Sequence, residues 1–259
     1  MAMPSPVHPT LDSTLFGDPP ARDDRFTVVQ TWAECANFPD DHPEKKLEFL
    51  HRQLNEELNV LENAATSLAR FPDVEWGLRM SLARQASDEA RHVLVYRRLL
   101  ERRGVQLGQY PVMNFQYRIL ERIGTLIGRL AVQNRTFEAD GLDAATHGIA
   151  EARVQGDTDL VAALDAQSAD EVFHIRFANQ WIKAQIRNSP RVALQVAVAL
   201  TQGSRAFQQV FAGGGTNVTK YGVAAGARLE AGFDAGEVAV ATDKAEARRV
   251  AILSGGDGA

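Results

Sequence analysis

The sequence predicts an all-α protein whose main domain is a four-helix bundle with one crossover connection. Two observations support this fold class. Four long segments carry apolar residues at helical spacing, and no convincing period-two stretch lies between them. Short breaks after the first and third segments make two antiparallel hairpins, so the connection over residues 104–114 must carry the chain from one hairpin to the other.

The four bundle helices are expected within residues 43–188. The first runs over 43–70, where leucines recur on one face, and Phe71-Pro72-Asp73 ends it. The second covers about 74–103 and stops at Gly104, and the third covers roughly 115–152. Gly156-Asp157-Thr158 then breaks the pattern and caps the fourth helix, which continues to about Asn188.

The segments on either side of the bundle are expected to be less regular. Residues 1–42 are predicted to be a flexible leader, rich in Pro, Asp and Ser up to residue 25, followed by a short apolar segment around Trp32. Residues 189–259 are predicted to form one additional amphipathic helix, from Pro190 to about Phe211, and a partly disordered tail. Within the tail, a short helix is expected near 218–230.

Composition narrows the class of protein. The net charge of −5 gives no electrostatic reason to expect nucleic acid or an anionic membrane as a partner. No apolar run approaches the length of a membrane span, and the N-terminus lacks the basic and apolar regions of a signal peptide. The single cysteine, Cys35, fits a reducing compartment. We therefore expect a cytoplasmic protein.

One motif occurs twice, in the second and in the fourth expected helix. Residues 85–92 read QASDEARH and residues 167–174 read QSADEVFH, so each contains Asp-Glu-x-x-His preceded by Gln. Because positions i and i+3 share a helix face, Glu89 with His92 can bind one metal ion from one side. Glu171 with His174 can do the same, and apolar neighbours place both pairs toward the interior. The duplication predicts two facing half-sites of a two-metal centre.

Each half-site needs a further carboxylate, which bundles of this kind take from the other two helices. On the third helix Glu138 is the candidate, because it flanks the inner apolar stripe. On the first helix Glu57 and Glu62 both flank the stripe, so periodicity does not separate them. Spacing favours Glu57, which precedes Glu89 by nearly the same interval as Glu138 precedes Glu171, and Glu62 is kept as the alternative.

Charge balance favours a metal over an empty acidic core. Four buried carboxylates would otherwise have to take up protons, whereas two divalent ions cancel their charge. Carboxylate oxygens with one imidazole per ion suit iron or manganese better than structural zinc. We expect two iron ions, or one manganese and one iron. Asp88 and Asp170 are expected to accept the free N–H of a ligand histidine and so fix its tautomer.

These motifs, together with residues 57–62 (ELNVLE), 70–73 (RFPD) and 137–143 (FEADGLD), resemble the ferritin-like superfamily of dimetal-carboxylate proteins. Over residues 44–188 they resemble an uncharacterised bacterial ferritin-like family known mainly as a domain of unknown function. The resemblance implies the fold and the ligand order Glu, Glu-x-x-His, Glu, Glu-x-x-His, but no substrate. In that family a Glu stands at position 57 and at position 62. Phe173 replaces Arg91 in the second copy, so a role of this arginine would concern one half only.

The leading functional hypothesis is an oxidase or oxygenase in which two iron ions activate O2 to oxidise a small organic substrate. Bridging roles are expected for Glu89 and Glu171. The alternatives are a ferroxidase or other iron-handling protein and a metal-free helical binding module. The sequence does not identify the electron donor, and its long amphipathic helices are compatible with a homodimer.

Overall fold

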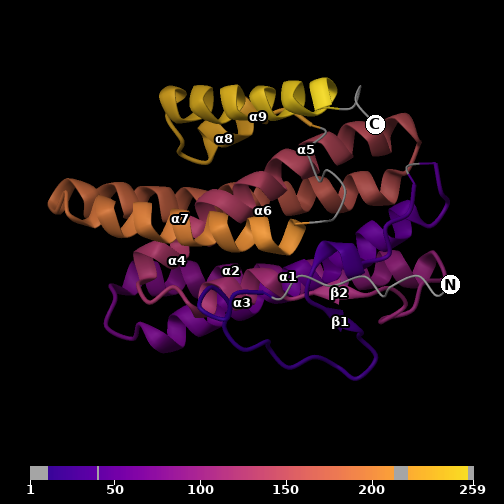
Figure 1. The fold of residues 1–259 in the computed structure, drawn as a ribbon, viewed down its shortest axis with the longest axis horizontal. Coiled ribbons are helices and arrows are strands. Elements are labelled where there is room, and N and C mark those ends of the chain that lie inside the picture. The colour runs from indigo at the N-terminus through magenta and orange to yellow at the C-terminus, as the bar shows by residue number, and fades with distance from the viewer. Residues whose placement is uncertain (1–10, 40, 213–220, 256–259) are drawn as a thin grey trace, which may run out of the picture.

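The computed structural model describes residues 11–39, 41–212 and 221–255, with residues 248–255 described by their backbone alone. The described chain is an all-α helical bundle, which confirms the expected fold class (Figure 1). The helices are α1 (Lys45–Arg70), α2 (Trp76–Arg102), α3 (Phe115–Glu121), α4 (Leu126–Val132), α5 (Glu138–Val154), α6 (Thr158–Asn188), α7 (Val192–Phe211), α8 (Ala225–Glu230) and α9 (Ala235–Gly255). Within the described ranges, no helix is long and apolar enough to cross a membrane.

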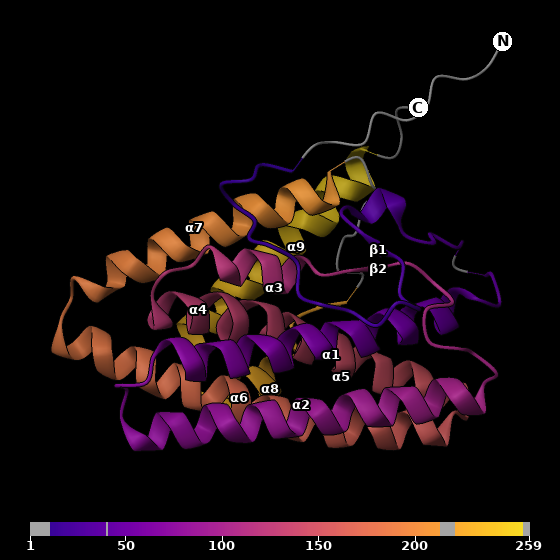
Figure 2. The same cartoon turned by 90° about the horizontal axis from the view of Figure 1, so that it is seen from below.

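Two helical hairpins form the centre of the bundle. Helix α1 packs along α2, α5 packs along α6, and α2 packs on α6, which joins the hairpins (Figure 2). The crossover between them contains strand β2 (Val112–Met113), which pairs in parallel with β1 (Val28–Val29). The buried ring of His51 also holds the crossover, because its Nε2 atom accepts a 2.8 Å hydrogen bond from the Gly108 amide.

The sequence predicts one helix over 115–152, but in the structure this part of the bundle is divided into several helices. Helix α3 ends at Glu121, and α4 begins after Thr125, whose hydroxyl accepts a 3.2 Å hydrogen bond from the Gly128 amide. This N-cap satisfies an amide that a continuous helix would satisfy with its own carbonyl groups. A π-helical turn, Gln133–Phe137, then connects α4 to α5 directly before Glu138. Such turns are frequent at functional sites.

The N-terminal segment packs on the bundle, unlike the flexible leader that the sequence predicts. Leu11, Leu15 and Phe16 are buried in one apolar cluster with residues of α3 and α7. Arg22 of this segment forms an ion pair with Glu62 of α1, which also holds the segment against the bundle. Apolar side chains are few in this segment, but they lie close enough together to form a patch that can be buried. Residues 1–10 of the expected leader lie outside the described residues.

The C-terminal segment is more helical than expected over its described part. Helix α7 packs on α4, and α8 packs on α5 and α6. The buried Arg228 of α8 donates hydrogen bonds to Asp143 of α5, the shortest of them 2.6 Å, which fixes α8 to the bundle. Helix α9 then packs on α8. The parts of the expected tail at 213–220 and 256–259 lie outside the described residues.

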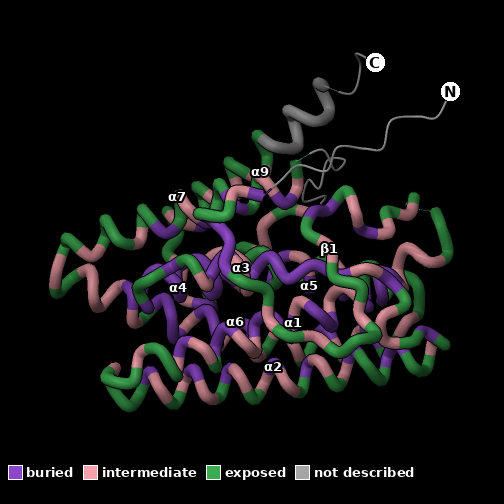
Figure 3. The backbone as a smooth tube through the Cα atoms, turned by 60° about the horizontal axis from the view of Figure 1, so that its bottom comes forward, coloured by how far each residue is buried: buried purple, intermediate pink, exposed green. Residues whose placement is uncertain are grey.

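Buried residues line the inner faces of the bundle helices (Figure 3), and the apolar ones among them form separate clusters along the bundle axis. Along α2, Leu78 and Leu82 belong to one apolar cluster, and Leu99 and Leu100 belong to another. Buried polar side chains lie between these two clusters. One of them is Glu89, which has no exposed surface. The bundle therefore encloses a polar centre between two apolar ends.

Candidate metal centre

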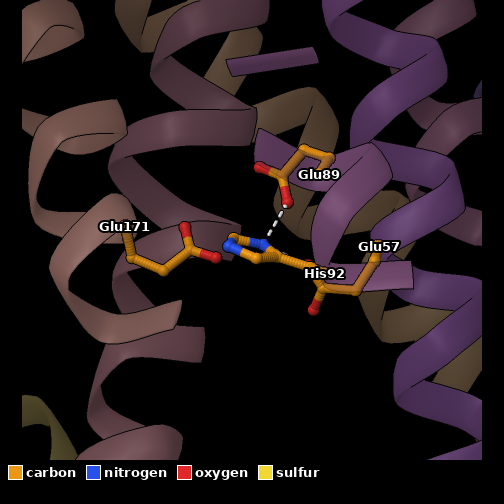
Figure 4. A group of neighbouring side chains, drawn as sticks. All are labelled: Glu57, Glu89, His92 and Glu171. Atoms are coloured by element: carbon orange, nitrogen blue, oxygen red, sulfur yellow. Dashed lines mark hydrogen bonds and ion pairs between the residues drawn. The ribbon is translucent and has the colours of Figure 1, made fainter. Parts of the chain in front are cut away.

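All six metal ligands expected from the sequence come together in this polar centre. They form two groups, in each of which the candidate ligand atoms lie within 4.8 Å of one another. One group contains Glu57, Glu89, His92 and Glu171, and the other contains Glu89, Glu138, Glu171 and His174. Figure 4 shows the first group converging from α1, α2 and α6. Glu89 and Glu171 belong to both groups, so each of these carboxylates could contact two ions if both groups held one.

The structure separates the two candidates on α1. Glu57 is buried, and its Oε2 atom lies 3.2 Å from Nδ1 of His92. Glu62 lies outside both groups and forms an ion pair with Arg22, with 2.6 Å between Oε1 and Nη1. The Glu62 carboxylate is therefore engaged by the N-terminal segment, and Glu57 takes the position in the centre.

The imidazole rings are oriented by aspartates of the facing helix. Nε2 of His92 lies 3.2 Å from Asp170 Oδ2, and Nε2 of His174 lies 3.3 Å from Asp88 Oδ2. A carboxylate at Nε2 favours the tautomer that carries its proton there, which leaves Nδ1 as a ligand atom. In both rings Nδ1 points into the centre, at 2.8 Å from Glu89 Oε2 for His92 and 3.1 Å from Glu89 Oε1 for His174.

Arg91 connects the two halves at the surface end of this arrangement. Its guanidinium lies 3.0 Å from Asp88 and 2.6 Å from Asp170, one aspartate from each copy of the motif. The expectation that this arginine concerns one half only is therefore wrong. Phe173, which replaces this arginine in the second copy, contacts a different arginine. The guanidinium carbon of Arg84 lies 3.8 Å from the centre of the Phe173 ring.

The two repeated glutamines also support the carboxylates, a role that sequence reasoning missed. Gln167 donates to Glu57 at 2.9 Å and accepts a 2.7 Å hydrogen bond from the Tyr96 hydroxyl. Gln85 donates to Glu138, and its Oε1 accepts from Asn134 at 3.1 Å. Their repetition four residues before each ligand Glu was the signal, because that spacing puts the amide on the same helix face as the carboxylate.

Burial and mutual contacts shift the pKa values of the carboxyl and imidazole groups in the centre. Burial raises the pKa of Glu57 and Glu138 well above the ordinary range of a carboxyl group. Burial acts in the same direction on Glu89, but the adjacent imidazoles of His174 and His92 hold its pKa at about 2. Burial opposes the protonation of His92, yet its hydrogen bonds to Glu57 and Glu89 raise its pKa to about 11. Divalent cations would displace these protons.

The donor set fits metal ions. His174 Nδ1 lies 3.1 Å from Glu89 Oε1 and 3.5 Å from Glu171 Oε2, but none of these three buried atoms is aligned for a hydrogen bond with a described residue. Buried polar atoms normally have a partner, so these orphaned atoms indicate that one is missing. Ligand atoms at about 2.0–2.2 Å from a common ion are necessarily separated by less than about 4.4 Å, close to the separations found in each group. The two groups could therefore hold metal ions.

A cavity adjoins the centre on one side, between α1 and α5. Its volume is about 590 Å³, including the part that is open to solvent. Glu57, Glu138 and Glu171 line its inner end, whereas neither histidine reaches it. Tyr96 and Gln133 line it as well, and both also form the hydrogen bonds expected of satisfied core residues. A molecule in this cavity would meet the centre at three of its carboxylates.

Comparison with known proteins identifies a family but no characterised relative. The sequence profile of the family described as "Protein of unknown function (DUF455)" matches residues 5–239. Searches of curated proteins and of solved structures give no significant match.

Proposed function

The chain belongs to this family of unknown function, DUF455, and from the geometry of its centre we propose that it is a ferritin-like dimetal-carboxylate oxidoreductase that uses O2. One observation carries the proposal. Six buried carboxylate and imidazole groups, two of them shared between two sets of ligands, converge beside a cavity that reaches three of the carboxylates. This arrangement provides for a pair of ions and for an organic molecule next to them.

The choice of metal follows from the donor atoms and their charge. Glu57, Glu89, Glu138 and Glu171 provide four negative charges when ionised, which two divalent ions would neutralise. Carboxylate oxygens with one imidazole for each ion suit iron or manganese, and the centre contains no thiolate among its described residues. We propose two iron ions, or one manganese and one iron. Such a pair, when bound, supplies the redox chemistry with O2 that protein side chains lack.

In this proposal, the residues around the metal ligands have distinct roles. Asp88 and Asp170 fix the histidine tautomers, so that Nδ1 is directed to an ion. Gln85 orients the carboxylate of Glu138, and Gln167 orients that of Glu57. The apolar clusters at both ends of the bundle keep bulk water from the centre, and the cavity leaves one side open to a substrate.

The cavity favours substrate oxidation over iron storage. A ferroxidase needs a path for iron to leave the centre after oxidation, whereas the described lining of this cavity outside the centre is apolar or amide, such as Phe137 and Gln116, with Glu56 as its one carboxylate. Such a lining is typical of sites for small organic molecules. The orphaned buried atoms of the centre argue against a metal-free binding module, because that module would leave them without partners.

The test is anaerobic loading with iron(II), followed by limited additions of reductant and O2. We expect O2 consumption in proportion to reductant, with no ferric mineral formed. Glu171→Gln should abolish consumption, and Glu101→Gln should retain it, because the Glu101 side chain on α2 is 54% exposed and pairs with Arg97. Accumulation of ferric mineral would support iron storage instead, and iron-loaded protein that consumes no O2 would refute the proposal.

A further inference from the structure

The cavity beside the centre owes its space to small residues on α5. Gly141, Ala144, Ala145 and Gly148 recur along the helix face that borders the cavity. A Cβ atom added at Gly141 would meet no atom within 4 Å, so this position faces open space. Helix α1 provides the opposite wall. Two lining residues are exposed to solvent, Phe49 on α1 and Gly141 on α5. The bundle therefore leaves a passage from the surface to the carboxylates.

The charges around the cavity select against anions. Its lining among the described residues includes Glu56, Glu57, Glu138 and Glu171 but no Lys, Arg or His. Two divalent ions would at most cancel the carboxylates of the centre, and they would leave no positive charge on the cavity wall. Along the wall away from the ions, an anionic group would thus be desolvated without a partner, which is strongly unfavourable.

A cationic ligand finds no available carboxylate either. Glu56 is the acidic lining residue outside the centre, and both of its oxygens are already engaged. Oε1 accepts a 3.0 Å hydrogen bond from Arg52, and Oε2 accepts a 2.9 Å hydrogen bond from Gln53. The charge of Glu56 is already balanced by the guanidinium of Arg52, so an ammonium group beside it would regain little of its desolvation cost.

The remaining lining matches an uncharged molecule with an apolar body. Phe49, Val60, Phe137 and Leu164 provide apolar surface for the body of such a molecule. Gln116 is buried and lines the cavity, and within the described part of the chain its amide nitrogen donates no hydrogen bond. This amide can hold one polar group of a ligand.

We propose that the cavity binds an uncharged, mainly apolar small molecule with one hydrogen-bonding group. As the assignment of a substrate class, the inference rests on the proposed function. As a statement about binding, it can be tested without turnover. Three fluorinated probes of similar size separate the effect of charge: 4-fluorobenzyl alcohol, 4-fluorobenzylamine and 4-fluorobenzenesulfonate. Their binding to zinc-loaded protein can be followed by ¹⁹F NMR, because zinc(II) is diamagnetic.

We expect the alcohol to bind at least about tenfold more tightly than the amine or the sulfonate. Gly141→Leu should weaken binding of the alcohol at least about fivefold, because the new side chain enters the cavity. Gly77→Leu is the matched control, since Gly77 is another helical glycine with open space around it but does not line the cavity. Both changes favour the helix, so neither should prevent folding.

Tighter or equal binding of the amine or the sulfonate would overturn the inference, as would an unchanged affinity in Gly141→Leu. The outcome is separable from that of the proposed function, because iron content and O2 consumption are measured independently on the same preparation. Protein that consumes O2 but prefers the sulfonate would refute only the substrate class. Protein that binds the alcohol but takes up no iron would refute only the redox function.

Discussion

Replacing Asp170 tests whether the aspartates control the centre across the bundle. Asp170 lies on α6, but its Oδ2 atom is 3.2 Å from Nε2 of His92 on α2. Asp170→Asn keeps an oxygen that can accept the same hydrogen bond but removes its charge, so we expect metal affinity to fall about tenfold at the position that His92 serves. This loss corresponds to about 1.4 kcal/mol. Asp170→Leu removes the acceptor as well, and we expect a loss of about a hundredfold.

Isothermal titration with manganese(II) measures both positions. In wild-type protein we expect two ions per chain, and in Asp170→Asn one of the two binding steps should weaken while the other stays unchanged. The change should disappear when His92→Ala has already removed that position, and it should persist in His174→Ala. Asp165→Asn is the control on the same helix, because the Asp165 side chain is 64% exposed. Equal weakening of both steps, or the same loss in the control, would refute this reasoning.

Three further predictions concern the scaffold. Arg228→Met should lower the free energy of unfolding by about 3–5 kcal/mol in urea denaturation, because it leaves the buried Asp143 without its ion-pair partner. Gly128→Ala should cost about 1–3 kcal/mol in the same assay, because the new Cβ would lie 2.8 Å from the Cβ of Ala199. Burial lowers the pKa of His51 to about 4. The folded protein therefore keeps this ring neutral while the unfolded chain binds a proton below about pH 6.5, so stability should fall between about pH 6.5 and 4, and His51→Gln should remove that contribution.

Each of these has a specific control. The double variant Arg228→Met with Asp143→Leu should recover part of the stability, and no recovery would mean that packing rather than charge explains the loss. Gly77→Ala should be neutral or stabilising, because an added Cβ there meets no atom within 4 Å. A pH dependence of unfolding that is identical in His51→Gln and wild type would contradict the assignment to this ring.

The centre was largely predictable because its signal is local and repeated. Glu89 with His92, and Glu171 with His174, lie three residues apart in two copies of one motif, and helical geometry alone places each pair on one face. The choice between Glu57 and Glu62 could not be made in this way. It depends on Arg22, which occupies Glu62 from a segment far away in the sequence, and no periodicity reports such a contact.

The interruptions and the flanking segments were less predictable for a different reason. The break before α4 depends on one capping hydroxyl, that of Thr125, within a segment whose apolar pattern continues across it. The N-terminal segment was expected to be flexible from its average composition. Its few apolar side chains, such as Phe16, are nevertheless sufficient to anchor it, because they meet a matching surface on α3 and α7 that is formed only in the folded protein.

Metal content after anaerobic loading with iron(II) and removal of loosely bound ions tests the central claim most directly. Wild-type protein should retain two ions per chain, and Glu62→Gln should retain two as well, because its carboxylate is held by Arg22 outside the centre. Glu89→Gln should lose affinity at both positions, since Glu89 belongs to both sets of ligands. Wild-type protein without bound metal, or a Glu89→Gln variant that keeps two ions while Glu62→Gln loses one, would contradict the account.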